Sequence, residues 1–293
     1  MTDENADAPV GFIGLGNMGA PMAKRLLEWA GGLIVCDVRA EAIAPFTEAG
    51  ARAADDPAAL ATEARVISVT VIDDGQVRDV VNGPKGILRT AAPGTVVAVH
   101  STISDTTAEE LAALCAGHGV EFVDAPVSGG AGAAEKGALA VMVGGTKAAV
   151  ERIRPPFGLF SNLIVHAGDV GAGTRMKLAR NLLHFVSFTA ATEAQRLAEA
   201  AGLNITKLGK VVRHSDAITG GAGAIMLRDT TAPIDPEDFW FPILSHVRDL
   251  GEKDLSLALE LGARLDVSLP LAELAASRLA EGLGVPASEK ERS

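Results

Sequence analysis

The amino-acid sequence predicts an α/β domain with a doubly wound parallel sheet, followed by an all-α domain that a long helix joins to it. Two observations support this order. Up to about residue 168, short β-rich runs alternate with helical segments, as in strands connected by crossover helices. Beyond about residue 170 the β-rich runs stop and helical periodicity continues. We therefore expect a first domain at residues 1–168 and a second at residues 169–293.

Short apolar runs predict the strands of the first domain. Their valine and isoleucine content favours extended backbone, and their length fits strands better than helices. The segments after the first two runs, NMGAPMAKRLLEWA and AEAIAPFTEAG, are long enough for one helix each. This alternation indicates parallel strands with helical crossovers. The predicted strands are residues 10–16, 33–38, 66–72, 95–101, 121–126, 139–145 and 162–168.

The second domain follows a glycine-rich segment, HAGDVGAG, at residues 166–173. Residues 176–203 contain almost no helix breaker and end beside Gly202, so they predict one long helix. Residues 250–265 and 270–284 also have helical periodicity. Because β-rich runs are missing from this part of the sequence, the domain is predicted to be entirely helical. We find no internal repeat and no low-complexity block.

Composition and charge argue against several classes of protein. Of the 293 residues, 48% are hydrophobic and 22% are charged, which is typical of a folded globular protein. The net charge of −11 and the scattered basic residues disfavour a nucleic-acid partner, because nucleic-acid-binding proteins concentrate positive charge. No apolar run approaches the length of a bilayer span, so no membrane partner is expected.

The first ten residues, MTDENADAPV, lack the basic start and apolar centre of a signal peptide, so we expect a cytoplasmic protein. The only cysteines, Cys36 and Cys115, lack the paired spacing of metal ligands, and no metal site is predicted.

A glycine-rich motif, GLGNMG at residues 14–19, follows the first predicted strand and precedes the first predicted helix. In such a motif the three glycines make a tight turn, let a pyrophosphate approach the backbone, and let helix and strand pack closely. The amides at the helix start then face the phosphates. An ordinary turn is the rival interpretation, but the surrounding strand and helix favour dinucleotide binding. The cofactor residues predicted here are Gly14, Gly16, Asn17, Met18 and Gly19.

The second predicted strand leads to Asp37, which lies 18 residues after Gly19. This is close to the place of the acid that binds the adenosine ribose hydroxyls in NAD-binding domains. Its carboxylate would repel a 2′-phosphate, which favours NAD over NADP. Arg39 follows two residues later, and its guanidinium could hold that phosphate, so NADP stays open as an alternative.

Hydride transfer at an alcohol carbon also needs a group that moves the proton on the oxygen. The chain has no tyrosine, and none of its six histidines stands in an obvious histidine–acid arrangement. Helical spacing puts Lys177, Asn181 and His184 on one face. A partly desolvated lysine has a lowered pKa and can exchange this proton. The residues alone leave a second interpretation open, in which Lys177 is a solvated charge and Asn181 an ordinary helical residue. His184 is interpreted as a core or lining residue.

Four segments together resemble the signature blocks of the β-hydroxyacid dehydrogenases, the family of 3-hydroxyisobutyrate dehydrogenase and related semialdehyde reductases. The blocks occur in the family's order and span most of the chain. The resemblance implies a Rossmann domain followed by a helical domain, assembled as a homodimer or homotetramer. The four segments are GFIGLGNMGAPMA (11–23), DAPVSGGAGAAEKGALAVMVGG (124–145), GAGTRMKLARN (171–181) and KDLSLAL (253–259).

The same resemblance implies roles for individual residues. Lys177 matches the family's catalytic lysine, and Asn181 matches its companion. Lys253 matches a lysine near the nicotinamide, for which a surface charge is the rival interpretation. Thr102 resembles a residue that faces the nicotinamide from the end of a strand, although a helix N-cap would also explain it. The substrate-binding block corresponds to Ser128, Gly129 and Gly130, where an ordinary turn is the alternative.

Some positions depart from the family's pattern and leave the substrate open. The loop after residues 66–72 lacks a proline that relatives often carry, and Val99 and His100 stand where relatives often have an acid. The tail lacks the aspartate-containing segment with which many relatives end. The aromatic segment FWFPILSHVRDLG at residues 239–251 precedes Lys253, and we expect it to reshape the substrate pocket.

The sequence therefore predicts an oxidoreductase that transfers a hydride between NAD and a small 3-hydroxy carboxylic acid or its semialdehyde. The alternative is an NADPH-dependent reductase of glyoxylate, tartronate semialdehyde or succinic semialdehyde. A 6-phosphogluconate dehydrogenase is disfavoured, because such an enzyme is much longer and has a dedicated phosphate site. Imine reductases carry another residue at the position of Lys177. A non-catalytic nucleotide-binding module is disfavoured because the lysine and the three glycines are intact.

Overall fold

The computed structural model describes residues 8–225, residue 228 and residues 232–287. Contacts within the chain define two compact units, which divide between Arg180 and Asn181. The division falls inside one long helix, and each unit is described by itself below.

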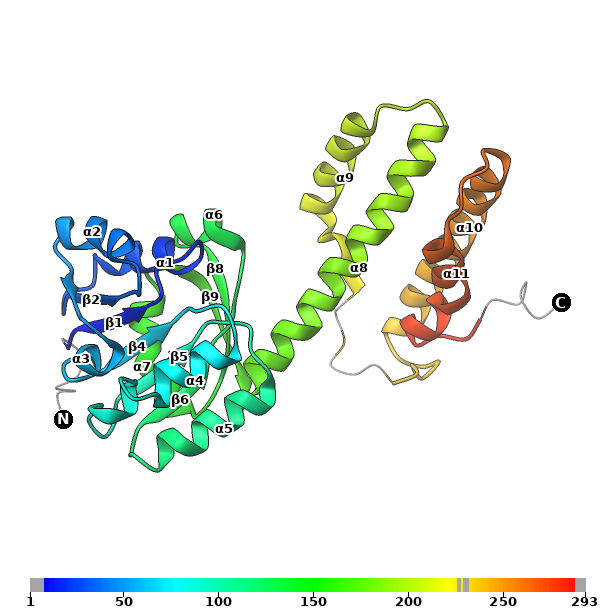
Figure 1. Cartoon of the computed structure of the whole chain (residues 1–293). Coiled ribbons are helices and arrows are strands. Elements are labelled where there is room, and N and C mark those ends of the chain that lie inside the picture. Colours follow the sequence, from blue (N-terminus) through cyan, green and yellow to red (C-terminus); the bar gives the residue numbers. More distant parts are fainter. Residues whose placement is uncertain (1–7, 226–227, 229–231, 288–293) are drawn as a thin grey trace. The chain divides into compact units, whose positions relative to one another are not determined.

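The first unit contains a nine-stranded sheet with helices on both faces (Figure 1), which confirms the predicted α/β class. The strand order is β3-β2-β1-β4-β5-β6-β8-β7, and β9 pairs with β8. The strands are β1 (Val10–Ile13), β2 (Leu33–Cys36), β3 (Arg52–Ala53), β4 (Val66–Val69), β5 (Val96–Val99), β6 (Glu121–Asp124), β7 (Val127–Ser128), β8 (Leu139–Gly144) and β9 (Ser161–Gly168).

The sheet is mixed, whereas the sequence predicted parallel strands throughout. Strands β1 to β6 pair in parallel, but β8 is antiparallel to both β6 and β7, and β9 is parallel to β8. The alternation of strands and helices does not reveal this reversal, because strand direction depends on pairing between segments distant in the sequence. Strand order changes direction between β1 and β4, and ligands of such sheets bind in the crevice beyond the carboxyl ends of these strands.

Successive residues of each central strand bury their side chains on opposite faces of the sheet. On β1, Phe12 joins one apolar cluster and Ile13 joins the other; on β2, Val35 and Ile34 are divided in the same way. Strands buried on both faces are continuous hydrophobic runs, as the sequence shows. Helices α1, α2, α6 and α7 contribute to the first cluster, and α3, α4 and α5 contribute to the second.

Side-chain caps start four helices of this unit. The cap residues accept a hydrogen bond from an amide of the first turn, which satisfies a donor without an intrahelical partner. They are Asp56, Asp73, Ser104 and Thr146, for α3, α4, α5 and α7 respectively. The helices of the unit are α1 (Gly19–Leu26), α2 (Ala40–Glu48), α3 (Pro57–Ala61), α4 (Asp74–Asn82), the 3-10 helix η1 (Ile87–Arg89), α5 (Asp105–Ala116), α6 (Gly130–Glu135) and α7 (Lys147–Phe157).

The second unit is helical in its described part, as predicted. The long helix expected at 176–203 is α8, which begins earlier, at Ala172, and continues from the first unit into the second. Its Glu193 carboxylate accepts hydrogen bonds from the amides of Leu271 and Ala272 in the first turn of α11. The elements are α8 (Ala172–Ala200), α9 (Ile205–Thr219), the 3-10 helix η2 (Gly221–Ile225), α10 (Trp240–Arg264) and α11 (Pro270–Leu283).

The two tryptophans of the chain lie in different units. Trp29 follows α1, and its indole N–H donates to the carbonyl of Ala8 at 3.0 Å. Trp240 begins α10 and packs against a small cluster that contains Leu244 and Leu283.

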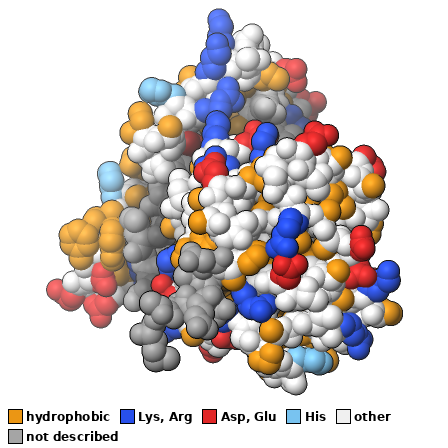
Figure 2. Space-filling view, turned by 90° about the vertical axis from the view of Figure 1, so that its left-hand side faces the viewer, with side chains coloured by type: hydrophobic (Ala, Val, Ile, Leu, Met, Phe, Trp, Pro, Cys, Tyr) orange, Lys and Arg blue, Asp and Glu red, His pale blue; other side chains and the backbone are white. Residues whose placement is uncertain are grey.

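Acidic and basic side chains are interspersed on the face of the molecule drawn in Figure 2. No helix in the described part of the chain has the length and apolar character needed to span a bilayer.

Candidate active site

The glycine motif forms the turn between β1 and α1. Gly14 has φ of +92°, and a Cβ there would lie 2.1 Å from the carbonyl oxygen of Thr70. A Cβ on Gly19 would lie 1.9 Å from the carbonyl oxygen of Gly14, so α1 packs directly on the turn. These two glycines therefore serve left-handed backbone and close helix–strand packing.

Gly16 differs from the other two glycines because a Cβ there would meet no heavy atom within 4 Å. The N-cap residue of α1 is Met18, which supplies no side-chain cap, and Asn17 is exposed beside it. An open glycine at an uncapped helix start fits a phosphate group that approaches the backbone. Next to this turn, the hydroxyl oxygen of Thr70 is buried without a hydrogen-bond partner in the described structure. These features fit the pyrophosphate of a dinucleotide.

Asp37 follows β2 at the same edge of the sheet. Its side chain is 6% exposed, and it accepts a hydrogen bond from the Leu15 amide at 2.6 Å. Arg39 donates to it from the backbone amide at 2.9 Å and from Nε at 3.2 Å. Burial by itself would raise the pKa of Asp37, but the hydrogen bonds from Arg39 and Leu15 outweigh burial and lower the pKa. The carboxylate is therefore charged at neutral pH, and Arg39 is held beside it.

The loop after β5 is bonded to the loop after β4. The Ser101 hydroxyl donates to the Val71 carbonyl at 2.7 Å and accepts from the Val71 amide at 2.9 Å. Thr102 is exposed in this loop, and Ser104 caps α5, so the alternative interpretation of Thr102 as an N-cap is wrong. Sequence reasoning did not single out Ser101, although it stands in the same segment as Thr102.

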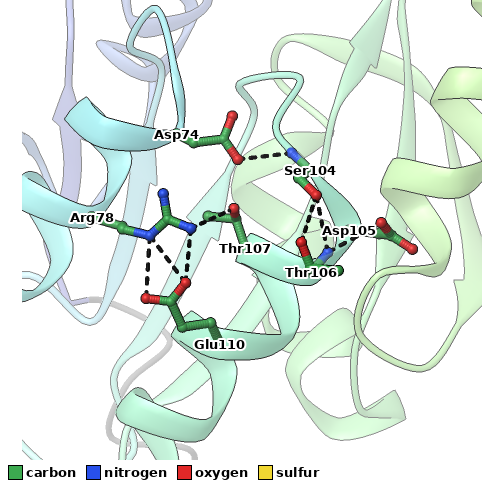
Figure 3. A network of polar contacts seen from close by, with 7 residues as sticks. All are labelled: Asp74, Arg78, Ser104, Asp105, Thr106, Thr107 and Glu110. Carbon is green, nitrogen blue, oxygen red and sulfur yellow. Dashed lines mark hydrogen bonds and ion pairs between the residues drawn. The ribbon is translucent and has the colours of Figure 1, made fainter.

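A polar network joins α4 and α5 beside this loop (Figure 3). Arg78 donates to both carboxylate oxygens of Glu110 at 2.8–3.2 Å and to the Thr107 hydroxyl at 2.9 Å. Asp74 accepts from the Ser104 amide at 2.9 Å, and its pKa is lowered, chiefly by a hydrogen bond with Thr107. The network holds together the starts of the two helices that follow β4 and β5.

The structure places Lys177 beside the predicted substrate-binding block. Its ammonium Nζ donates to the Val127 carbonyl at 2.6 Å, one residue before Ser128. Ser128 ends β7 and is half-buried. Gly129 has φ of +132° and caps α6, whereas a Cβ on Gly130 would meet no heavy atom within 4 Å. The lysine and an open backbone segment therefore lie next to each other.

Lys177 is half-buried, and its surroundings lower its pKa from the ordinary value of a lysine. The main cause is burial, which disfavours the charged form, and the second is the nearby positive charge of Arg180. Lys177 is thus partly buried and hydrogen-bonded to Val127, while its catalytic role stays a prediction. A lysine in this state can give up a proton more readily than a surface lysine.

Asp124 joins the start of α8 to the end of β6 and was missed by sequence reasoning. It is completely buried, and its carboxylate accepts hydrogen bonds from the amides of Gly171 at 2.7 Å and Thr174 at 2.6 Å. Burial raises its pKa despite these hydrogen bonds. Its position directly after the apolar residues of a strand, within DAPVSGG, was the available signal.

The remaining predicted residues belong to the second unit. Asn181 lies one helical turn after Lys177 on α8 and is half-buried. His184 packs against Phe188 with their rings tilted by 58° and their centroids 4.4 Å apart. Lys253 lies on α10 with an exposed side chain. The aromatic segment at 239–251 includes the first residues of the same helix.

Family profiles match both parts of the chain. The NAD-binding domain of 6-phosphogluconate dehydrogenase matches residues 9–168. A second profile, described as NAD-binding of NADP-dependent 3-hydroxyisobutyrate dehydrogenase, matches residues 171–289.

Individual relatives match over most of their length. An uncharacterised oxidoreductase of Mycobacterium tuberculosis is 60% identical over 291 residues, which cover 99% of this chain and 98% of the relative. The 2-(hydroxymethyl)glutarate dehydrogenase of Eubacterium barkeri is 34% identical, with coverage of 91% and 86% respectively. A structure of Mycobacterium tuberculosis 3-hydroxyisobutyrate dehydrogenase with L-serine is 32% identical, with a TM-score of 0.65, and covers 94% of this chain and 93% of its own.

Proposed function

This chain belongs to the β-hydroxyacid dehydrogenase family of NAD(P)-dependent enzymes, and we propose that it interconverts a small 3-hydroxy carboxylic acid and its semialdehyde, with Lys177 as the general acid–base. The observation that carries this proposal is the 2.6 Å hydrogen bond from the Lys177 ammonium to the Val127 carbonyl, directly before the Ser128 block. A bound nicotinamide would accept or return the hydride.

Lys177 would move the proton that accompanies the hydride. In the oxidation, its neutral amine accepts the proton of the substrate hydroxyl; in the reduction, its ammonium returns a proton to the carbonyl oxygen. The lowered pKa makes the neutral amine accessible at a pH where a surface lysine stays charged. The Val127 carbonyl accepts from the ammonium and so limits where Nζ can lie.

The Ser128 block would bind the substrate carboxylate. The Ser128 hydroxyl and the backbone amides of Gly129 and Gly130 are donors, and Gly130 has space where a side chain would otherwise lie. Asn181, one turn after Lys177 on α8, is proposed to orient the reacting oxygen. Thr102 and Lys253 are proposed to lie near the nicotinamide.

The names of the relatives narrow the proposed substrate. The compounds 3-hydroxyisobutyrate, L-serine and 2-(hydroxymethyl)glutarate all carry a hydroxymethyl group and a carboxylate on the same carbon, and they differ in the third substituent of that carbon. We therefore propose a 3-hydroxypropanoate substituted at carbon 2. The proposed cofactor is NAD, on the basis of Asp37. An NADPH-dependent reductase of glyoxylate, tartronate semialdehyde or succinic semialdehyde is the alternative, because Arg39 adjoins the ribose position. The homodimer or homotetramer and the cytoplasmic location stay predictions.

Replacement of the lysine tests the proposal. In a spectrophotometric screen of 2-substituted 3-hydroxy acids and semialdehydes with each nicotinamide, Lys177→Ala should lower kcat by about 10²–10⁴-fold, because a general acid–base group is lost. Its affinity for NADH, measured by fluorescence titration, should stay at the wild-type value. Lys147→Ala, at an exposed lysine of α7, is the matched control and should keep wild-type kcat. Retention of most activity in Lys177→Ala would remove the lysine from the mechanism.

A further inference from the structure

We infer that Asp124 is a positioning residue for Lys177, an inference that rests on the proposed function of that lysine. Asp124 ends β6, and its buried carboxylate accepts from the amides of Gly171 and Thr174. The first amide precedes α8 and the second belongs to its first turn. A carboxylate from strand β6 therefore accepts hydrogen bonds from the first amides of α8, as the side chain of an N-cap residue would.

The same two chain segments meet a second time at the lysine. Val127 lies three residues after Asp124, and Lys177 lies three residues after Thr174, which is close to one helical turn. The Lys177 ammonium donates to the Val127 carbonyl. The anchor at Asp124 and the contact at Lys177 thus join the segments 124–127 and 174–177 at both ends. A shift of the first turn of α8 would move Nζ away from Ser128.

Two glycines let the start of α8 approach the sheet closely enough for this anchor. A Cβ on Gly173 would lie 2.4 Å from the carbonyl oxygen of Met142. A Cβ on Gly144 would lie 2.3 Å from Oδ1 of Asp124. Side chains at positions 144 and 173 would therefore clash with the carboxylate or with the sheet, so the helix start packs closely against both. Such packing is rigid, so displacement of one partner is transmitted to the other.

The test compares Asp124→Asn with wild type. The isosteric amide keeps one acceptor but turns an NH2 group toward the other backbone amide, so the helix start should shift. We expect kcat to fall by about 10–100-fold, because small displacements of a catalytic group have effects of this size. The NADH dissociation constant should stay within about twofold of wild type. The pKa of the Lys177 amine, followed by NMR of carbon-13-labelled lysine and assigned with Lys177→Arg, should rise as the side chain becomes more exposed.

A purely structural role predicts a different result. In that case Asp124→Asn would lower the melting temperature, while the folded protein would keep wild-type kcat and an unchanged Lys177 pKa, and the inference would be overturned. If Asp124→Asn does not fold, Gly173→Ala is the deciding variant, because it displaces the start of α8 from the sheet without a change of charge. A wild-type kcat and a wild-type Lys177 pKa in Gly173→Ala would overturn the inference. Arg175→Ala is the matched control, since it removes exposed ion pairs to Asp105 and Glu109 from the same helix turn and should leave kcat unchanged.

Failure of the proposed function gives a separate signature. Equal kcat values in wild type and Lys177→Ala would remove Lys177 from catalysis, whereas the effect of Asp124→Asn on the Lys177 pKa would still report whether Asp124 positions the side chain.

Discussion

At the residue scale, the side chain of Asp37 after β2 shows how a neighbouring residue affects a predicted cofactor contact. That neighbour is Arg39, which donates hydrogen bonds to the Asp37 carboxylate. The carboxylate accepts from the Leu15 amide and from Arg39 at once. In the proposed complex, the ribose hydroxyls would compete with the Arg39 side chain for the carboxylate oxygens of Asp37. The ion pair therefore couples the acid proposed to bind the ribose of NAD to the guanidinium that could bind the 2′-phosphate of NADP.

Asp37→Ala should weaken NAD binding and shift cofactor preference toward NADP by about tenfold or more. The substitution removes the acceptor for the ribose hydroxyls and releases the Arg39 guanidinium for a phosphate. The ratio of kcat/KM for NAD and NADP measures the change. Glu41→Ala removes an exposed acid of α2 and controls for net charge. An unchanged ratio in Asp37→Ala would disprove the ribose role.

His100 is a buried histidine without a place in the proposed mechanism. Its Nδ1 lies 2.7 Å from the Ala125 carbonyl and its Nε2 lies 3.0 Å from the Ser68 hydroxyl. The tilted ring of Phe157 packs against it at a centroid distance of 5.0 Å. Because a carbonyl only accepts, Nδ1 carries the proton of the neutral ring. Burial lowers the pKa of His100 to about 4, from 6.5.

This lowered pKa predicts a dependence of stability on pH. Between pH 6.5 and 4 the unfolded chain binds a proton at this histidine and the folded chain does not. The free energy of unfolding therefore decreases as the pH is lowered through this range. The loss from His100 alone should reach about 3 kcal/mol near pH 4. Denaturant titrations of wild type and His100→Gln at several pH values measure it by difference, since acidic residues contribute to both proteins. His118→Gln, at an exposed site, is the control. Parallel curves for wild type and His100→Gln would contradict the prediction.

At the scale of elements, two helices obtain their N-terminal caps from other elements. The start of α8 is bonded to Asp124 of β6, and the start of α11 is bonded to Glu193 of α8. Leu269, the N-cap residue of α11, provides no side-chain cap. A buried carboxylate therefore satisfies the first amides of α11 and faces the positive end of its dipole.

Glu193→Gln should destabilise the helical unit by about 1–2 kcal/mol, because a charge-assisted pair of hydrogen bonds becomes a neutral pair with one mismatched donor. Differential scanning calorimetry should show a lower transition temperature for the variant. Glu199→Gln on the exposed side of α8 should leave the transition in place. Equal transitions for Glu193→Gln and wild type would mean that the cap contributes nothing measurable.

Contacts between distant residues and short glycine-rich turns explain why the boundaries of elements were predicted less well than their existence. The predicted strand at 10–16 ends at Ile13, because the apolar residues after it belong to the glycine turn. The predicted helix at 176 begins at Ala172, because its cap comes from a residue about fifty positions earlier in the chain. The strand β7 and the helix α6 within the Ser128 block were not predicted, since short glycine-rich segments have no clear periodicity.

At the scale of the whole molecule, the sequence predicted the order of classes: a sheet domain, then helices. Periodicity carries that information, because each strand and helix must bury its own apolar residues. The antiparallel β8 could not be predicted, since strand direction depends on pairing between distant segments. The candidate site also has a part that could be predicted and a part that could not. The motif from Gly14 to Gly19 was recognisable from adjacent residues, whereas the hydrogen bond from Lys177 to Val127 joins residues fifty positions apart.

The distribution of indole groups gives the protein an optical property. With no tyrosine and one tryptophan in each compact unit, intrinsic emission arises from Trp29 in the sheet unit and Trp240 in the helical unit. Trp29→Phe would leave a signal from the helices alone, and Trp240→Phe would leave one from the sheet alone. Whether the two halves of the chain lose their folds together or in succession can thus be read from the light that each emits, without any added dye.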